Sequence, residues 1–296
     1  MSATKTYAPL MVLSIIWGMA FVAIRALEPL LTPVNMTLLR WFLASAGFLA
    51  LAPFFGRLNQ KFERRDIPRL LLVAFANVVS YHLTLNYSES QISAGLAVLL
   101  VAIGPVFILI LSWLFLGERH GRQMIIIVAL AFMGALILSL GSEYMMGTST
   151  LAGVLEAFGT ALSYSVFAVF SKPLVQKYGA RPFTIWAGLL GTVMLIPLIS
   201  GSFITQVAAL PLYGWLSMIY LSVLSTVVGY MLFYTLVNRG AVSKLSIQLY
   251  LIPVVGVAGG ALLLGESITL FTIIGGAVML AAVAMSTKLR TSKAKR

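Results

Sequence analysis

The polar residues in and just after the apolar segment 69–87 are spaced as on a helix. Asn77, Tyr81, Thr84 and Ser88 share one face, and His82, Asn86 and Glu89 form a second stripe about 100° away. Polar groups facing lipid are costly, so at least one stripe should face a cavity or a neighbouring helix. His82 is the only histidine inside an apolar segment. We expect it either to contact a substrate or to form a structural bond between helices.

Aromatic residues at matching positions predict walls for a planar ligand. Trp17 lies near the start of the first half of the chain, and Tyr164 lies at the equivalent place in the second half, 147 residues later. Together they are placed to flank a planar substrate, although an aromatic stripe also serves core packing. We predict a substrate-binding set made of Trp17, Asn77, Tyr81, His82, Leu99, Tyr164, Tyr230, Tyr234 and Gln248.

Some neighbouring residues are assigned to structure instead of binding. Ser222, Ser225, Thr226 and Gly229 form a small-residue face that favours close helix packing. Trp41, Trp113, Trp186 and Trp215 are interpreted as interface anchors or packing residues.

Two prolines in mid-segment predict hinges. Proline removes a backbone hydrogen bond and clashes with the carbonyl four residues earlier. Pro105 with Gly104, and Pro253 with Gly256, would interrupt segments 93–116 and 242–264. Matched interruptions of this kind point to a binding site near the middle of a membrane. The alternative is that a neighbouring helix re-satisfies the backbone and the proline is ordinary.

Charged residues within or beside apolar segments have fewer expected roles. Arg40 should pair with an acid such as Glu28 or Glu156, pair with a substrate carboxylate, or extend outward to the membrane surface. Glu118 and Glu266 each follow a helix end, and we expect them to bond backbone amides of the next helix.

The motifs of catalysis and cofactor binding are missing from the sequence. The chain has no cysteine, no G-x-S-x-G elbow, no paired intramembrane acids and no His/Cys/Asp/Glu cluster suited to a metal. It also lacks a P-loop, which excludes a nucleotide-driven pump. We therefore expect no cofactor and no catalytic residues, and an intramembrane enzyme remains a remote alternative.

The elements that must position these residues are membrane-spanning helices. Of the 296 residues, 60% are hydrophobic and 9% are charged, whereas a soluble domain averages about 45–50% and 25%. Ten apolar segments are long enough to span a bilayer as helices. They cover 7–26, 34–54, 69–87, 93–116, 123–140, 151–171, 183–200, 212–237, 242–264 and 270–287.

The net charge of +12 comes from basic residues that lie mainly in loops and in the C-terminal tail. With an N-terminus on the inside, 18 of the 20 basic residues fall on one side of the membrane or in the tail. This pattern predicts ten spans with both termini in the cytoplasm. The charge is therefore a topology signal, and we expect no nucleic-acid partner.

The two halves repeat. Pro105 and Glu118 are 13 residues apart, as are Pro253 and Glu266, and the two pairs are offset by 148 residues. Each half holds five segments, so the second half enters the membrane from the opposite side. We predict an all-α polytopic membrane protein made of two inverted five-helix repeats, 1–146 and 147–287, with a basic cytoplasmic tail at 288–296.

These features resemble the drug/metabolite transporter superfamily, and within it the ten-helix EamA-type exporters. The resemblance rests on Trp17-Gly18, on Pro105 with Leu116-Gly117-Glu118, and on Pro253 with Leu264-Gly265-Glu266. It implies secondary export of small metabolites across the bacterial inner membrane, with the fifth and tenth spans peripheral. Tyr81-His82 and the aromatic first and sixth spans are similar to the aromatic amino acid exporter branch. Leu13-Ser14-Ile15 replaces the acidic residue that small four-helix members use for proton exchange, which argues against that mechanism.

The sequence thus predicts a secondary transporter that exports small metabolites by alternating access. Amino acids with aromatic or amphipathic character are the expected substrates, and the lipid bilayer is the expected surrounding. A passive facilitator, or an exporter of another metabolite or drug, is the alternative. The protein is expected as a monomer or a homodimer.

Overall fold

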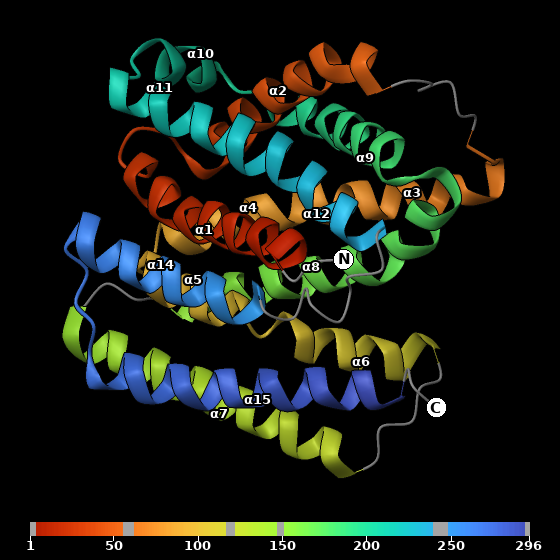
Figure 1. Ribbon diagram of the computed structural model, residues 1–296. Helices are drawn as coiled ribbons and strands as arrows, with labels where there is room; N and C mark the ends of the chain where they lie inside the picture. The colour runs from red at the N-terminus through yellow and green to blue at the C-terminus, as the bar shows by residue number, and fades with distance from the viewer. Residues whose placement is uncertain (1–3, 56–61, 117–121, 147–150, 239–247, 294–296) are drawn as a thin grey trace.

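The computed structural model describes residues 4–55, 62–116, 122–146, 151–238 and 248–293, and every regular element within them is a helix (Figure 1). The α-helices are α1 (Thr4–Leu27), α2 (Pro33–Leu51), α3 (Ile67–Ala74), α4 (Tyr81–Glu89), α5 (Ala94–Val101), α6 (Gly104–Leu116), α7 (Arg122–Met146), α8 (Leu151–Tyr178), α9 (Ala180–Leu195), α10 (Gly201–Ala208), α11 (Leu212–Ile219), α12 (Gly229–Asn238), α14 (Gln248–Leu264) and α15 (Leu270–Lys293). The π-helical segments are η3 (Phe75–Ser80) and η5 (Tyr220–Val228), and the short 3-10 turns are η1 (Ala52–Phe55), η2 (Arg64–Asp66) and η4 (Ile196–Leu198).

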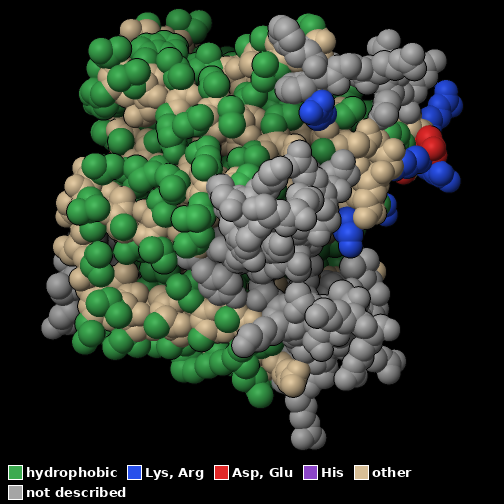
Figure 2. All heavy atoms as spheres, in the orientation of Figure 1, with side chains coloured by type: hydrophobic (Ala, Val, Ile, Leu, Met, Phe, Trp, Pro, Cys, Tyr) green, Lys and Arg blue, Asp and Glu red, His purple; other side chains and the backbone are tan. Residues whose placement is uncertain are grey.

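The helices have the length and composition of membrane spans. Seven described helices are long and apolar enough to cross a bilayer, and three shorter apolar helices cover 125–138, 251–264 and 270–285. Their outer surfaces are apolar: Leu262, Leu212 and Ile125 are 82%, 76% and 70% exposed. Outside the grey atoms, hydrophobic side chains are spread over the face in Figure 2, and charged side chains lie toward one side of it. The protein is a multi-pass membrane protein; the number ten and the side of each terminus remain predictions.

The third and eighth predicted spans contain matching π-helical segments. The third span runs without a break through α3, η3 and α4, and the eighth runs through α11, η5 and α12. A π-helical segment widens the helix locally and occurs frequently at functional sites. Neither segment is expected from the sequence, and α10 is not expected either.

The predicted break at Pro105 is present, but its counterpart is not. The α5 helix ends at Val101 and α6 starts at Gly104, which makes Pro105 the second residue of a helix, where its missing N–H is not needed. Pro253 lies inside α14, which is continuous. The expectation of two matched interruptions is therefore wrong for the second half, and the hinge role of both prolines stays a prediction.

Helix pairs far apart in sequence hold the bundle together. The α1 helix packs along α14, α4 and α6 pack on α8, and α2 packs on α9. The α7 and α15 helices lie side by side and reach the rest of the bundle through α5 and α6 (Figure 1), in agreement with the peripheral position expected of the fifth and tenth spans. Close approach of α1 and α14 needs a glycine, because a Cβ at Gly18 would lie 2.6 Å from Val255 Cβ.

The glutamate of the second Leu-Gly-Glu motif joins the two halves. Gly265 follows α14 with φ of 69°, a conformation that favours glycine at a helix C-terminus. Glu266 then accepts hydrogen bonds from the backbone amides of Ala94 (2.8 Å) and Gly95 (2.9 Å) at the start of α5. The expectation that Glu266 bonds backbone amides is confirmed, but the amides belong to α5 and not to the next helix. Gly117 and Glu118 of the first motif lie outside the described residues, as do Arg57, Lys61, Arg239 and Lys244.

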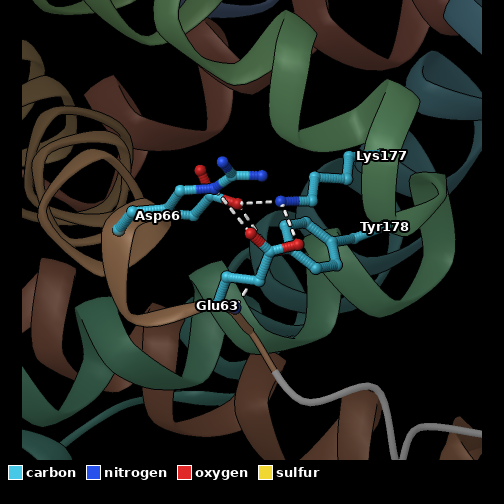
Figure 3. Close-up of polar contacts among 5 residues, drawn as sticks. Glu63, Asp66, Lys177 and Tyr178 are labelled. Carbon is cyan, nitrogen blue, oxygen red and sulfur yellow. Dashed lines mark hydrogen bonds and ion pairs between the residues drawn. The ribbon is translucent and has the colours of Figure 1, made fainter.

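Charged side chains meet where the start of α3 approaches the end of α8. Figure 3 shows Lys177 reaching between Glu63 and Asp66; its Nζ lies 2.6 Å from a carboxylate oxygen of each. Arg65 pairs with Glu63 at 2.5 Å, and the Tyr178 hydroxyl donates to Asp66 at 2.6 Å. We call these five residues the charged cluster, and they lie on the side that the charge pattern assigns to the cytoplasm.

Candidate functional site

A tyrosine that follows η5 bonds a side chain of η3 in the interior of the bundle. The Tyr230 hydroxyl, just after η5, donates to the Asn77 side-chain oxygen in η3 at 2.8 Å. His82 Nδ1 lies 2.9 Å from the backbone carbonyl of Asn77. Because a carbonyl only accepts, Nδ1 carries the hydrogen, and Nε2 of the neutral ring is then an acceptor. Asn77, His82 and Tyr230 are all buried, so the structure brings these three predicted residues together.

His82 and Trp41 leave two polar atoms without partners. The Trp41 and His82 rings meet edge to face with centroids 5.1 Å apart, and the Tyr81 and His82 rings meet in the same way at 4.9 Å. Neither Trp41 Nε1 nor His82 Nε2 has a hydrogen-bond partner among the described residues, although both atoms are buried. Such atoms usually pair with something. Trp41, expected from the sequence to be a packing or interface residue, has its indole at the border of the site.

Trp17 reaches the same region from α1. Its Nε1 donates to the backbone carbonyl of Ser225 at 3.1 Å, and its ring lies 5.8 Å from Tyr230 and 5.3 Å from Phe233. Tyr164 packs differently, with its ring near Phe167 and against Gly104, where a Cβ would lie 3.1 Å from Tyr164 Cδ1. Trp17 and Tyr164 border the same buried cluster, but each contacts its own set of neighbours.

Leu99, Tyr234 and Gln248 are not brought to this site by the described contacts. Leu99 is buried in a separate hydrophobic cluster and faces Gly276 of α15. The side chains of Tyr234 and Gln248 lie outside the described residues.

Arg40 is buried beside η5 and does not extend to the surface. It is 5% exposed, and it donates from Nε to Thr226 Oγ1 at 2.9 Å and from Nη2 to Ser225 Oγ at 3.2 Å. Among the described residues, no carboxylate lies within ion-pair distance of it. The expected pairs with Glu28 and Glu156 are therefore absent from the described ion pairs. Ser225 and Thr226, assigned from sequence to helix packing, hold this guanidinium.

Two residues of the first polar stripe of the third span bond a neighbouring helix. The Thr84 hydroxyl lies 2.8 Å from that of Thr160, and the Ser88 hydroxyl donates to the carbonyl of Gly153 at 2.9 Å. Both partners are on α8, so this part of the stripe faces a neighbouring helix, which is one of the two expected positions.

Glu89 ends the second stripe without a partner. Its side chain is fully buried, and neither carboxylate oxygen has a hydrogen-bond partner among the described residues. Arg25 donates to the backbone carbonyl of Glu89 at 2.6 Å and not to the carboxylate. An ionisable group that is buried without a partner is costly. In the part of the chain that the structure describes, no three His, Cys, Asp or Glu residues are grouped to bind a metal.

Comparisons with known proteins match this architecture. The EamA-like transporter family matches residues 5–140 and 151–288. An uncharacterized transporter of Archaeoglobus fulgidus is 30% identical over 89% of this chain and 92% of its own. A probable terminal-alkyne amino-acid exporter of Streptantibioticus cattleyicolor is 31% identical over 96% and 93%, and a probable amino-acid metabolite efflux pump of Escherichia coli is 27% identical over 90% and 89%.

A solved structure agrees with the fold. It is described only as the crystal structure of a protein, and it superposes with a TM-score of 0.63 at 18% identity, covering 97% of this chain and 98% of the other. At that identity the likeness concerns the fold alone. The family match over nearly the whole length indicates membrane transport and not enzymatic catalysis: the chain belongs to the EamA-like transporter family.

Proposed function

We propose that this protein exports amino acids or related small metabolites, with a preference for aromatic or amphipathic side chains, across the bacterial inner membrane. The observation that carries the proposal is the pair of unpartnered buried atoms, Trp41 Nε1 and His82 Nε2. They lie among aromatic rings that offer a flat apolar ligand both packing surface and a few fixed polar contacts, as ligand sites usually do. The names of the Streptantibioticus and Escherichia relatives, an amino-acid exporter and an amino-acid metabolite efflux pump, support the substrate class.

Transport by alternating access between two inverted repeats is part of this proposal. Several contacts support an internal two-fold relation between 1–146 and 147–287. Ser45 and Thr192 hydroxyls lie 2.8 Å apart and are separated by 147 residues, the same offset that relates Trp17 to Tyr164. The first span of each half also packs on the fourth span of the other half, as α1 on α14 and α8 on α5 and α6.

The break between α5 and α6 supports a hinge near Pro105. A helix end in mid-membrane lets the two pieces tilt separately. Pro253 and Gly256 would serve as the second hinge only if α14 bends in another state, because the helix is continuous here.

Transport in liposomes tests the substrate. The full chain is reconstituted, the liposomes are loaded with labelled phenylalanine, tryptophan, aspartate or lysine, and release is compared with protein-free liposomes. We expect faster release of the aromatic pair. Release of none of the amino acids, while another metabolite leaves, would refute the substrate class. Accumulation of substrate against its gradient distinguishes coupled transport from a passive facilitator.

Cysteine labelling tests the topology. Because the chain has no cysteine, single cysteines report one position each. Ser200→Cys should react with an impermeant maleimide in whole cells, and Ser292→Cys should react only after the membrane is opened. The reverse pattern would place both termini outside.

A further inference from the structure

Arg40 is a buried cation whose described partners are all neutral. It lies in α2, is 5% exposed, and bonds only the hydroxyls of Ser225 and Thr226 among the described residues. A charged side chain at the centre of a bilayer is costly unless it is paired or faces a polar cavity. Two hydroxyls satisfy hydrogen bonds but bring no negative charge.

The hydroxyl partners leave the guanidinium free to bind more. Thr226 donates its own hydrogen to the carbonyl of Leu221 at 2.8 Å, so it meets Arg40 as an acceptor. A guanidinium has five N–H donors arranged to match a carboxylate with two parallel bonds. Two of these donors are used by Ser225 and Thr226. The widened helix η5 thus holds the cation in place without neutralising it.

Arg40 is also next to the aromatic part of the candidate site. Tyr81, Tyr220 and Tyr230 are close enough to interact with its charge. Ser225, which accepts from Arg40 through its hydroxyl, also accepts through its carbonyl from Trp17 Nε1. The described acid whose charge reaches Arg40 is Glu89, and it forms no ion pair with it. Ser225 therefore links the Arg40 guanidinium to the Trp17 indole.

We propose that Arg40 binds the carboxylate of the transported substrate, with the substrate side chain packed toward Trp17, Tyr81 and Tyr230. This inference rests on the proposed function and adds that the substrate is recognised as an acid. The competing explanation is that Arg40 only ties α2 to η5.

The test compares an amino acid with its amide. Phenylalanine and phenylalaninamide share the ring and the amino group, and only the first has a carboxylate. Transport of both labelled compounds is measured in liposomes for wild type, Arg40→Gln, Arg40→Lys and the control Arg25→Gln, which removes an arginine that bonds a backbone carbonyl instead. Size-exclusion profiles and melting temperatures establish that each variant is folded.

We expect wild type to prefer the acid by about tenfold or more, because hydrogen bonds to charged groups contribute strongly. Arg40→Gln should lose that preference by slowing the acid about tenfold while the amide changes little. Arg40→Lys should keep part of the preference, since lysine keeps the positive charge but cannot form two parallel hydrogen bonds to a carboxylate. Arg25→Gln should leave the acid-to-amide ratio unchanged.

An unchanged acid-to-amide ratio in a folded Arg40→Gln protein would refute the role of Arg40 in binding the carboxylate. The proposed function would not be affected. If neither Arg40 variant folds, the test rests on the acid-to-amide transport ratio of the wild type. Equal transport of acid and amide would then refute carboxylate binding by Arg40. A wild type that moves neither compound, nor any other amino acid, removes the proposed function and carboxylate binding by Arg40 together.

Discussion

The charged cluster and the buried site differ in how their polar atoms are satisfied. In the charged cluster, Lys177 lies 2.6 Å from Glu63 and from Asp66, and Tyr178 donates to the same Asp66. In the interior, Trp41 Nε1, His82 Nε2 and both oxygens of Glu89 have no described partner.

This contrast is the reverse of what stability alone would favour. Exposed ion pairs add little, because water already solvates each charge. An unpartnered polar atom in the interior costs far more. The charged cluster is fully paired although each of its ion pairs adds little stability. We therefore assign it a structural role on the predicted cytoplasmic side. The unpartnered atoms Trp41 Nε1 and His82 Nε2 are those on which the proposed substrate site rests.

The contrast is sharpest between two carboxylates, Glu266 and Glu89. Glu266 accepts from the amides of Ala94 and Gly95, so Glu266→Gln turns one acceptor into a donor facing an N–H. We expect a loss of about 2 kcal/mol in unfolding free energy, seen as a melting temperature several degrees lower in detergent. Glu28→Gln is the control at the same side, and it should melt like wild type. A Glu266→Gln protein that melts like wild type would mean that the hydrogen bonds from Ala94 and Gly95 to Glu266 contribute little to stability.

His82 tests whether an unpartnered atom binds substrate. Asparagine can replace the Nδ1 donor to the carbonyl of Asn77 but has no atom at Nε2. We expect His82→Asn to fold normally and to transport phenylalanine about tenfold more slowly, which corresponds to about 1.4 kcal/mol. The control is Thr184→Val, because the Thr184 hydroxyl only donates within its own helix, to Ala180 at 2.7 Å. Unchanged transport by His82→Asn would assign Nε2 to packing.

Glu89→Gln is the counterpart of Glu266→Gln and should have a smaller effect. Its carboxylate has no described partner to lose, and glutamine keeps the shape without a charge that burial penalises. Arg25, Arg40 and Glu266 are the charged groups that interact with it. We expect a change in stability within about 1 kcal/mol, in either direction, in the same melting assay. A loss as large as that of Glu266→Gln would reveal a partner of Glu89 and weaken the contrast.

The sequence predicts part of this arrangement. Hydrophobic periodicity and charge placement are local, and they predict the multi-pass helical class and the two polar stripes that carry Asn77 and His82. Periodicity gives a face but not the helix it meets. It therefore could not show that Leu99 faces Gly276 in another cluster.

The π-helical segments are harder to predict, because no residue type marks them. They arise when packing forces one extra residue into a turn. The position of Arg40 depends on η5 reaching it from 185 residues away through Ser225, and no local pattern contains that information.

Substitution of Lys177 in the charged cluster should have the smallest effect on stability of the changes considered. The hydrogen bond from Lys177 lowers the pKa of Glu63 below its usual 4.5. A lowered pKa in the folded state stabilises the fold above pH 4.5, and that contribution is lost as the pH falls through the lowered value. Lys177→Met should therefore lower the melting temperature by no more than about 2 °C at pH 7, and the difference from wild type should shrink as the pH falls below 4.5 and through the lowered pKa values of Glu63 and Asp66. Lys172→Met, at another exposed lysine of α8, serves as the control. A difference that stays constant from pH 7 to pH 3 would assign the effect to packing of the lysine stem, and the ion pairs of the cluster would then contribute nothing measurable.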